Sequence, residues 1–162
     1  MSHPTLGLPP RNLTAGFPEG AARLRAASAR IAARALEDAI ERDPTLRTRH
    51  DDLGLRHLLR DAATYLERIA VSVASLDPGP TAEWAEWVVP LYRRRRVPLG
   101  DVINLSEGLR RSVRGVLTPE EQPAADAAID AAIKVLKWHR RLAGDARKRN
   151  RILAFIYKGA SL

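Results

Sequence analysis

The stretch that decides the fold spans residues 118–162 and reads TPEEQPAADAAIDAAIKVLKWHRRLAGDARKRNRILAFIYKGASL. It opens as a helix start, because Thr118 can cap the chain, Pro119 fits the first turn and Glu121 can complete a capping box. After this opening the stretch has a single glycine before residue 158 and no proline beyond residue 123. It therefore predicts one long helix over 119–158, far longer than the three or so turns of an ordinary helix.

The same stretch carries the charge of the chain. Residues 131–162 contain nine Lys or Arg against one acidic residue, Asp145, and their net charge of +8 equals that of the whole chain. Six of these cations form a basic patch: Arg140, Arg141, Arg147, Lys148, Arg149 and Arg151. A cluster of cations like this can bind the phosphates of a nucleic acid regardless of its base sequence. The sequence contains no compact helix-turn-helix, no aromatic stacking surface and no zinc ligand set. As a partner of the basic patch, nucleic acid is therefore less favoured than an acidic protein.

Length and hydrophobic pattern favour a single all-α domain. The 162 residues fit one domain, and no segment alternates apolar and polar residues as a half-buried strand does. Apolar residues at three- and four-residue spacing predict four helices before the long one, over 19–42, 53–76, 81–96 and 98–116. Residues 1–18 hold four prolines and two glycines, so we expect an irregular N-terminal segment followed by one domain over 19–162.

The composition also bears on location. The chain has no cysteine, so it offers no disulfide, no thiolate metal site and no thiol nucleophile, which suits a cytoplasmic protein. Its N-terminus lacks a basic patch followed by an apolar run, and no apolar stretch is long enough to span a bilayer. We therefore expect a cytoplasmic chain with no membrane partner.

Several short motifs follow one another in a familiar order. They are Asp43-Pro44, Leu58-Leu59-Arg60-Asp61, Tyr65-Leu66, Asp77-Pro78, Trp84 with Trp87, Arg96-Val97-Pro98, Asp101-Val102 and Leu117-Thr118-Pro119-Glu120. This series resembles the globin-like, non-haem N-terminal sensor domains of the stressosome RsbT co-antagonist family. The resemblance implies a globin-like fold, a homodimer built through the last helices, no haem and a sensory role without catalysis. In that family the last helix leads to an output domain, so here we expect a separate signalling partner protein.

A globin-like fold raises the question of haem, whose iron usually takes a histidine ligand. The helix expected before the run 93–96 contains no histidine, and His57 could at best approach a pocket from the other side. We therefore expect no haem and no other cofactor or metal, with a haem-binding gas sensor as the alternative. If a ligand pocket exists, it would be lined by His57, Tyr65, Trp84, Trp87 and Leu109, although both tryptophans are more simply explained as core residues.

The long helix carries a 3.5-residue apolar repeat, the spacing of a coiled-coil seam. The repeat comprises Ala132, Leu136, His139, Ala143, Ala146, Asn150, Leu153 and Tyr157. His139 and Asn150 interrupt it with polar groups that can fix register, and Phe155 adds to an apolar C-terminal end that needs covering. We interpret this helix as the dimer or partner contact; the alternative is that its first half simply packs on the body.

Catalytic signals are missing from the sequence. It has no Gly-rich phosphate loop, no nucleophile elbow and no His-Glu-x-x-His zinc pair, and its paired carboxylates stand in linkers or first helical turns. The sequence therefore predicts a non-enzymatic sensor or adaptor of a bacterial stress or signalling pathway. A haem-binding gas sensor and a nucleic-acid-binding protein are the alternatives.

Overall fold

The computed structural model describes residues 12–144, and every regular element among them is a helix. Seven helices follow in order: α1 (Pro18–Ala26), α2 (Ser28–Arg42), α3 (Leu46–Arg49), α4 (Asp52–Ser75), α5 (Gly79–Arg94), α6 (Leu99–Val113) and α7 (Gln122–Ala143). The prediction of an all-α chain is confirmed. No helix of the described part is long and apolar enough to cross a membrane.

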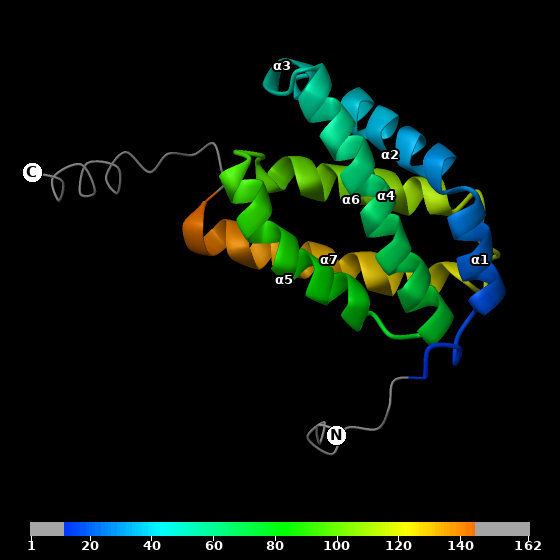
Figure 1. Cartoon of the computed structure of the whole chain (residues 1–162). Coiled ribbons are helices and arrows are strands. Elements are labelled where there is room, and N and C mark those ends of the chain that lie inside the picture. The colour runs from blue at the N-terminus through cyan, green and yellow to red at the C-terminus, as the bar shows by residue number, and fades with distance from the viewer. Residues whose placement is uncertain (1–11, 145–162) are drawn as a thin grey trace, which may run out of the picture.

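The helices pack in pairs around one apolar core. Figure 1 shows α4 crossing α6 and α5 lying alongside α7, while α2 packs along α6 and α1 against α4. The core is lined mostly by Leu, Ile, Val and Ala, with Tyr65 and Trp84 as its largest aromatic pair. Their rings stack with centroids 4.1 Å apart and planes 17° from parallel. Small residues let the helices approach closely, as where Gly108 of α6 lies against the backbone of Ala35 in α2.

The N-terminal part differs from the expected single helix over 19–42. The chain breaks at Ala27, and α1 and α2 take different directions because α1 packs on α4 whereas α2 packs mainly on α6. The segment between the helices expected over 19–42 and 53–76 contains the short helix α3, whose Leu46 is fully buried. Periodicity alone shows neither feature, since both follow from contacts with distant helices.

Thr81 and Pro90 of α5 both have contacts that are unusual for a helix. The helix begins at Gly79, two residues before the start expected at residue 81. The hydroxyl of the buried Thr81 lies 2.8 Å from the Pro78 carbonyl oxygen and 2.5 Å from that of Ala128 on α7. Pro90 lies inside the helix without ending it, exposed on the side away from the core. A proline there removes one helical hydrogen bond, which water can replace on the solvent side.

The start of α7 confirms half of the expected capping box. The Glu121 carboxylate accepts a hydrogen bond of 2.8 Å from the Thr118 backbone N–H, but the helix begins only at Gln122. Arg23 of α1 also donates to Glu121, at 2.5 Å, so the box is tied to the first helix as well. At the other end α7 stops at Ala143, where Gly144 has φ 73°. The remainder of the predicted helix over 119–158 lies outside the described residues.

The Glu121 contact predicts a pH dependence of stability. Burial opposes ionisation of this carboxyl, but hydrogen bonds from Arg23 and Thr118 outweigh it and lower the pKa below the ordinary 4.5. A carboxyl with a lowered folded pKa stabilises the fold above its unfolded pKa and loses that effect as pH falls. We expect the urea midpoint of the wild type to fall more steeply than that of Glu121→Gln below about pH 4.5. Parallel midpoint curves for the two chains would contradict this account.

Candidate functional site

A hollow opens where the start of α4 faces the end of α5. Asp51 caps α4 by accepting a 2.7 Å hydrogen bond from the Gly54 backbone N–H. On the opposite side α5 ends in consecutive arginines, and Arg96 takes the left-handed conformation with φ 57°. This turn lets the Val97 N–H donate back to the Tyr92 carbonyl at 2.9 Å, as at many helix C-termini. The two helix ends leave between them a hollow of about 1050 Å³.

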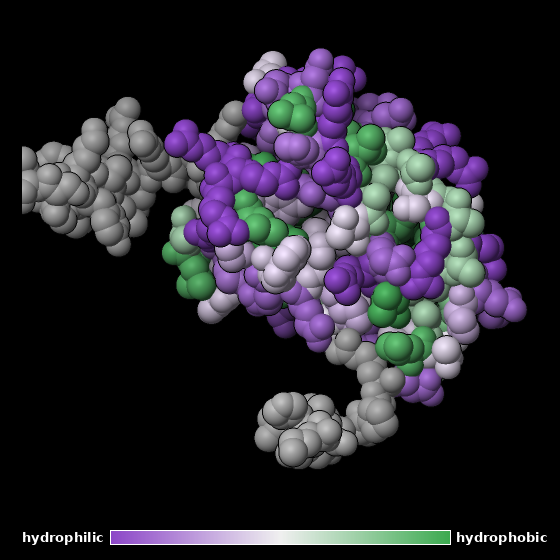
Figure 2. Space-filling model, in the orientation of Figure 1, coloured by the Kyte–Doolittle hydropathy of each residue, from purple (hydrophilic) through white to green (hydrophobic). Residues whose placement is uncertain are grey.

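The lining of this hollow is mainly polar and cationic. Figure 2 shows hydrophilic side chains crowding that part of the surface, above and beside the end of α5. The lining comprises Thr48, Arg49, His50, Asp51, Leu53, Gly54, His57, Arg93, Arg95, Arg96 and Val97. Among the residues that the structure describes, apolar side chains come only from Leu53 and Val97, and no aromatic residue other than histidine takes part. The surface therefore favours anionic or strongly polar groups.

The carboxylates of Asp101 and Asp43 neutralise part of this charge. Asp101 at the start of α6 is 5% exposed and accepts from Arg49 at 2.7 Å, while its other oxygen lies 2.7 Å from His50 Nε2. Arg49 also binds Asp43 at 2.5 Å, and hydrogen bonds from Thr45 and then Arg49 lower the pKa of that aspartate. This network ties α3 to α6 and closes one wall of the hollow.

The arginines at the end of α5 differ in the ion pairs and hydrogen bonds that their guanidinium groups form. Arg95 forms a 2.8 Å ion pair with Asp61 of α4. Arg93 donates to the His139 carbonyl oxygen of α7 at 3.0 Å. Arg96 makes no ion pair within the described residues and remains available to a ligand or to water.

The predicted pocket residues do not gather at one opening. His57 is half-buried and lines the hollow, whereas Tyr65, Trp84 and Leu109 are core residues. Burial raises the pKa of the Tyr65 hydroxyl well above 10, so this group is a neutral phenol inside the core. Trp87 lies outside this group altogether, with 67% of its surface exposed on α5.

The predicted partner helix is divided between the core and the surface. Leu136 is fully buried against the body, Ala143 is exposed, and the half-buried His139 places its Nε2 2.6 Å from Glu86 of α5. Arg140 and Arg141 are exposed, as a basic patch requires. The other proposed members lie outside the described residues: Arg147, Lys148, Arg149, Asn150, Arg151, Leu153, Phe155 and Tyr157.

Sequence reasoning missed the elements that make the hollow. Asp101 was considered only as part of a motif, and Arg49 and His50 were assigned to a linker. The available signal was an aspartate in the first turn of an apolar helix. The signal is weak, because a carboxylate there can cap the helix, pair with a cation or remain exposed to solvent. Only the path of α3 brings its partners within hydrogen-bonding distance.

The fold defines the class of protein as an all-α bundle whose first helices pack across its last ones. A family model described as phycobilisome protein matches residues 17–136, most of the chain and nearly all of the described helices. The chain therefore belongs to the phycobilisome protein family, whose fold is globin-like, and the predicted globin-like fold is confirmed. No curated protein matches the chain significantly.

This finding corrects the family inferred from the short motifs. The resemblance to the stressosome RsbT co-antagonist family is wrong, and with it the predicted role as a sensor or adaptor in stress signalling. The haem-globin alternative is not supported either. The motifs misled because residues such as Asp43-Pro44 and Asp77-Pro78 mark helix ends, which globin-like families of different function share.

Phycobilisome proteins bind bilin pigments, so the residues here must be compared with that group. Covalent attachment of a bilin uses a cysteine thiol, and these 162 residues contain none. A tetrapyrrole also needs a largely apolar slot, whereas the hollow is arginine-rich and the Tyr65–Trp84 stack is packed inside the core. The residues therefore do not fit a covalently held bilin. No three metal-ligating side chains cluster in the described part of the chain either.

Proposed function

We propose that this chain is a non-enzymatic structural subunit of the light-harvesting phycobilisome type that carries no covalent pigment. The observation that carries the proposal is the family match over 17–136 combined with the lack of any cysteine. Members of this family work by assembling into oligomers. Such a subunit contributes packing surfaces and spacing to an assembly rather than an absorbing group.

The polar groups of the hollow support a structural role. Asp101, Arg49 and His50 satisfy one another across α3 and α6, and Arg95 pairs with Asp61 across α4 and α5. Groups used in this way hold helix ends in place. The exposed Trp87 offers contact surface for assembly, since tryptophan is enriched in protein interfaces.

Production of the chain in cells that synthesise a bilin tests the proposal. We expect no bilin fluorescence on a denaturing gel, no visible absorption after gel filtration, and a particle larger than a monomer in analytical ultracentrifugation. A cysteine-containing member of the family, produced in the same cells, is the positive control for pigment supply. Visible absorption that co-elutes with the chain would disprove the unpigmented role, and a monomer at all concentrations would disprove the assembly role.

A further inference from the structure

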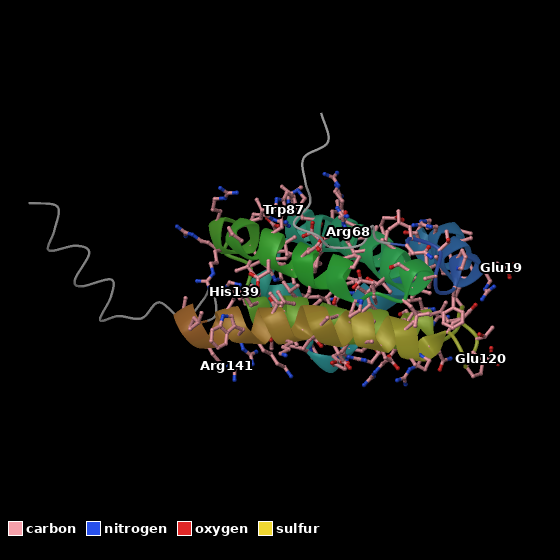
Figure 3. All side chains as sticks on the ribbon, turned by 90° about the horizontal axis from the view of Figure 1, so that it is seen from below. Glu19, Arg68, Trp87, Glu120, His139 and Arg141 are labelled. Atoms are coloured by element: carbon pink, nitrogen blue, oxygen red, sulfur yellow. The ribbon has the colours of Figure 1, made fainter. Side chains whose placement is uncertain are left out.

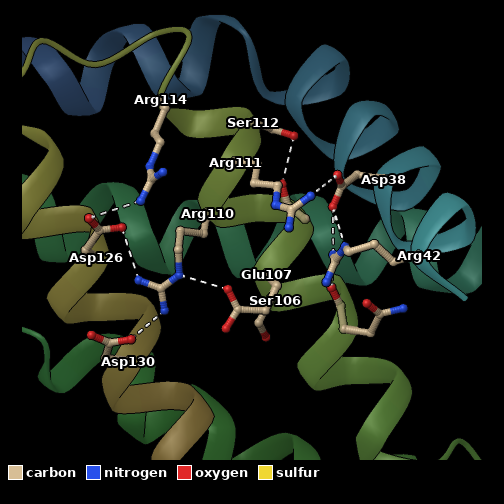
Figure 4. A network of polar contacts seen from close by, with 12 residues as sticks. Asp38, Arg42, Ser106, Glu107, Arg110, Arg111, Ser112, Arg114, Asp126 and Asp130 are labelled. Carbon is tan, nitrogen blue, oxygen red and sulfur yellow. Dashed lines mark hydrogen bonds and ion pairs between the residues drawn. The ribbon is translucent and has the colours of Figure 1, made fainter.

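The outward face of α7 changes character along its length. Its first half presents Asp126 and Asp130, and both bind Arg110 of α6 (Figure 4). Its second half exposes four cations and two large apolar side chains: Lys134, Lys137, Trp138, Arg140, Arg141 and Leu142. We call these six residues the α7 end surface. Figure 3 shows Arg141 pointing away from the rest of the helix bundle.

The cations of the α7 end surface are not neutralised by carboxylates of the described part of the chain. None of the four forms an ion pair with another described residue, in contrast to Arg110, which has three carboxylate partners. Together with Asp130 and Ile133 they border a shallow hollow of about 380 Å³. Unpaired like charges on one surface repel one another, so an anionic partner that screens them would be favoured.

Apolar side chains lie among these cations. Trp138 is 51% exposed and Leu142, one turn further, is 64% exposed. The Arg141 guanidinium lies 5.7 Å from the centroid of the Trp138 ring. Tryptophan and leucine surrounded by Lys and Arg are typical of helices that lie at a membrane interface, with the rings at headgroup depth and the cations on phosphates.

The sequence continues this combination. Arg147, Lys148, Arg149 and Arg151 follow, and then an apolar group that contains Ile152, Leu153, Phe155 and Ile156. A nucleic acid would take the cations but leave the apolar side chains exposed. An acidic protein would need one groove with carboxylates for the four cations and apolar slots for Trp138 and Leu142. An anionic lipid surface provides phosphates and an apolar layer together.

We propose that the α7 end surface docks this protein onto an anionic lipid bilayer. The cations contact lipid phosphates while Trp138 and Leu142 enter the interfacial layer. We expected no membrane partner because no apolar stretch is long enough to span a bilayer. Binding to the bilayer surface does not require a spanning segment. The proposal uses neither the hollow between α4 and α5 nor the family assignment, so it can fail while the proposed structural role stands.

Sedimentation of the full chain with vesicles tests the proposal. We expect binding to vesicles of phosphatidylcholine with phosphatidylglycerol, weakening with salt, and no binding to phosphatidylcholine alone. The triple variant Lys134→Gln, Lys137→Gln, Arg141→Gln should bind on the order of 100-fold more weakly. Each cation near an anionic bilayer contributes roughly fivefold to the affinity, and the three factors multiply. Trp138→Ala should bind roughly tenfold more weakly at low and high salt alike, because it loses apolar burial rather than charge.

The matched control removes the same charge elsewhere. The triple variant Arg56→Gln, Arg60→Gln, Arg68→Gln changes three exposed cations of α4. Figure 3 shows Arg68 on the side of the bundle away from Arg141. This variant should bind vesicles as the wild type does, and circular dichroism should show all variants folded. Equal losses in both triple variants would overturn the proposal. A lack of vesicle binding at low salt would also overturn the proposal. This includes the outcome in which duplex DNA or polyglutamate, and not the vesicles, binds the α7 end surface.

Discussion

Gly108→Ala is expected to destabilise the protein by about 2–3 kcal/mol, because the added methyl group has no space. A Cβ at this position would lie 2.3 Å from the Ala35 carbonyl oxygen and 3.0 Å from its carbon. Both are backbone atoms of α2, so no side-chain rotation relieves the clash and the two helices must separate. The cost exceeds the gain of about 1 kcal/mol that alanine brings to a helix interior.

Separation of α2 from α6 would also disturb polar contacts between them. Asn104 donates to the Ala39 carbonyl at 2.9 Å, and Arg42 donates to the Asn104 carbonyl at 2.7 Å. Urea unfolding followed by circular dichroism measures the effect. Gly115→Ala is the matched control, because the nearest atom to its added Cβ is 3.8 Å away. We expect that variant to change stability by less than about 1 kcal/mol; similar losses in both variants would refute the close-approach argument.

The second large effect is expected at Asp101. Asp101→Asn should cost about 3 kcal/mol, because it removes the negative charge that Arg49 and His50 face at a nearly buried position. The asparagine amide would also direct a donor toward groups that already donate. Arg49 keeps its contact with Asp43, which limits the loss.

Asp130→Asn provides the comparison for Asp101. Its side chain is 68% exposed, and its partner Arg110 retains Glu107 and Asp126. Exposed pairs of this kind contribute less than about 1 kcal/mol. Equal destabilisation by the two substitutions in urea titrations would show that burial of Asp101 does not increase its contribution to the free energy of unfolding. A loss confined to Asp101→Asn would confirm that the network joining α3 to α6 stabilises the fold.

The helical pattern was predictable wherever one face of a helix meets the core. The apolar spacing in 53–76 and 98–116 predicted α4 and α6 to within a few residues, because core packing selects residues every three or four positions. The break at Ala27 and the helix α3 were not predictable in this way. They depend on which distant helix each segment contacts, and local spacing does not record that.

The candidate site was predicted less well than the fold. His57 was singled out and lines the hollow, but Tyr65, Trp84 and Leu109 belong to the core. An apolar or aromatic residue on a helix face can line a pocket or fill an interior, and the sequence is the same in both cases. The family was misassigned for a related reason, since short helix-end motifs occur throughout globin-like folds.

The sequence by itself determined that the chain is helical, that it has no thiol for covalent pigment and that its positive charge is concentrated after residue 131. These properties follow from composition and local spacing. Only the tertiary structure decided which charges are neutralised. Asp101 meets Arg49 and His50, and Asp126 and Asp130 meet Arg110, while Lys134, Lys137 and Arg140 have no carboxylate partner in the described part. The physical reason is that an ion pair acts over a few ångströms, and chain folding alone sets those distances.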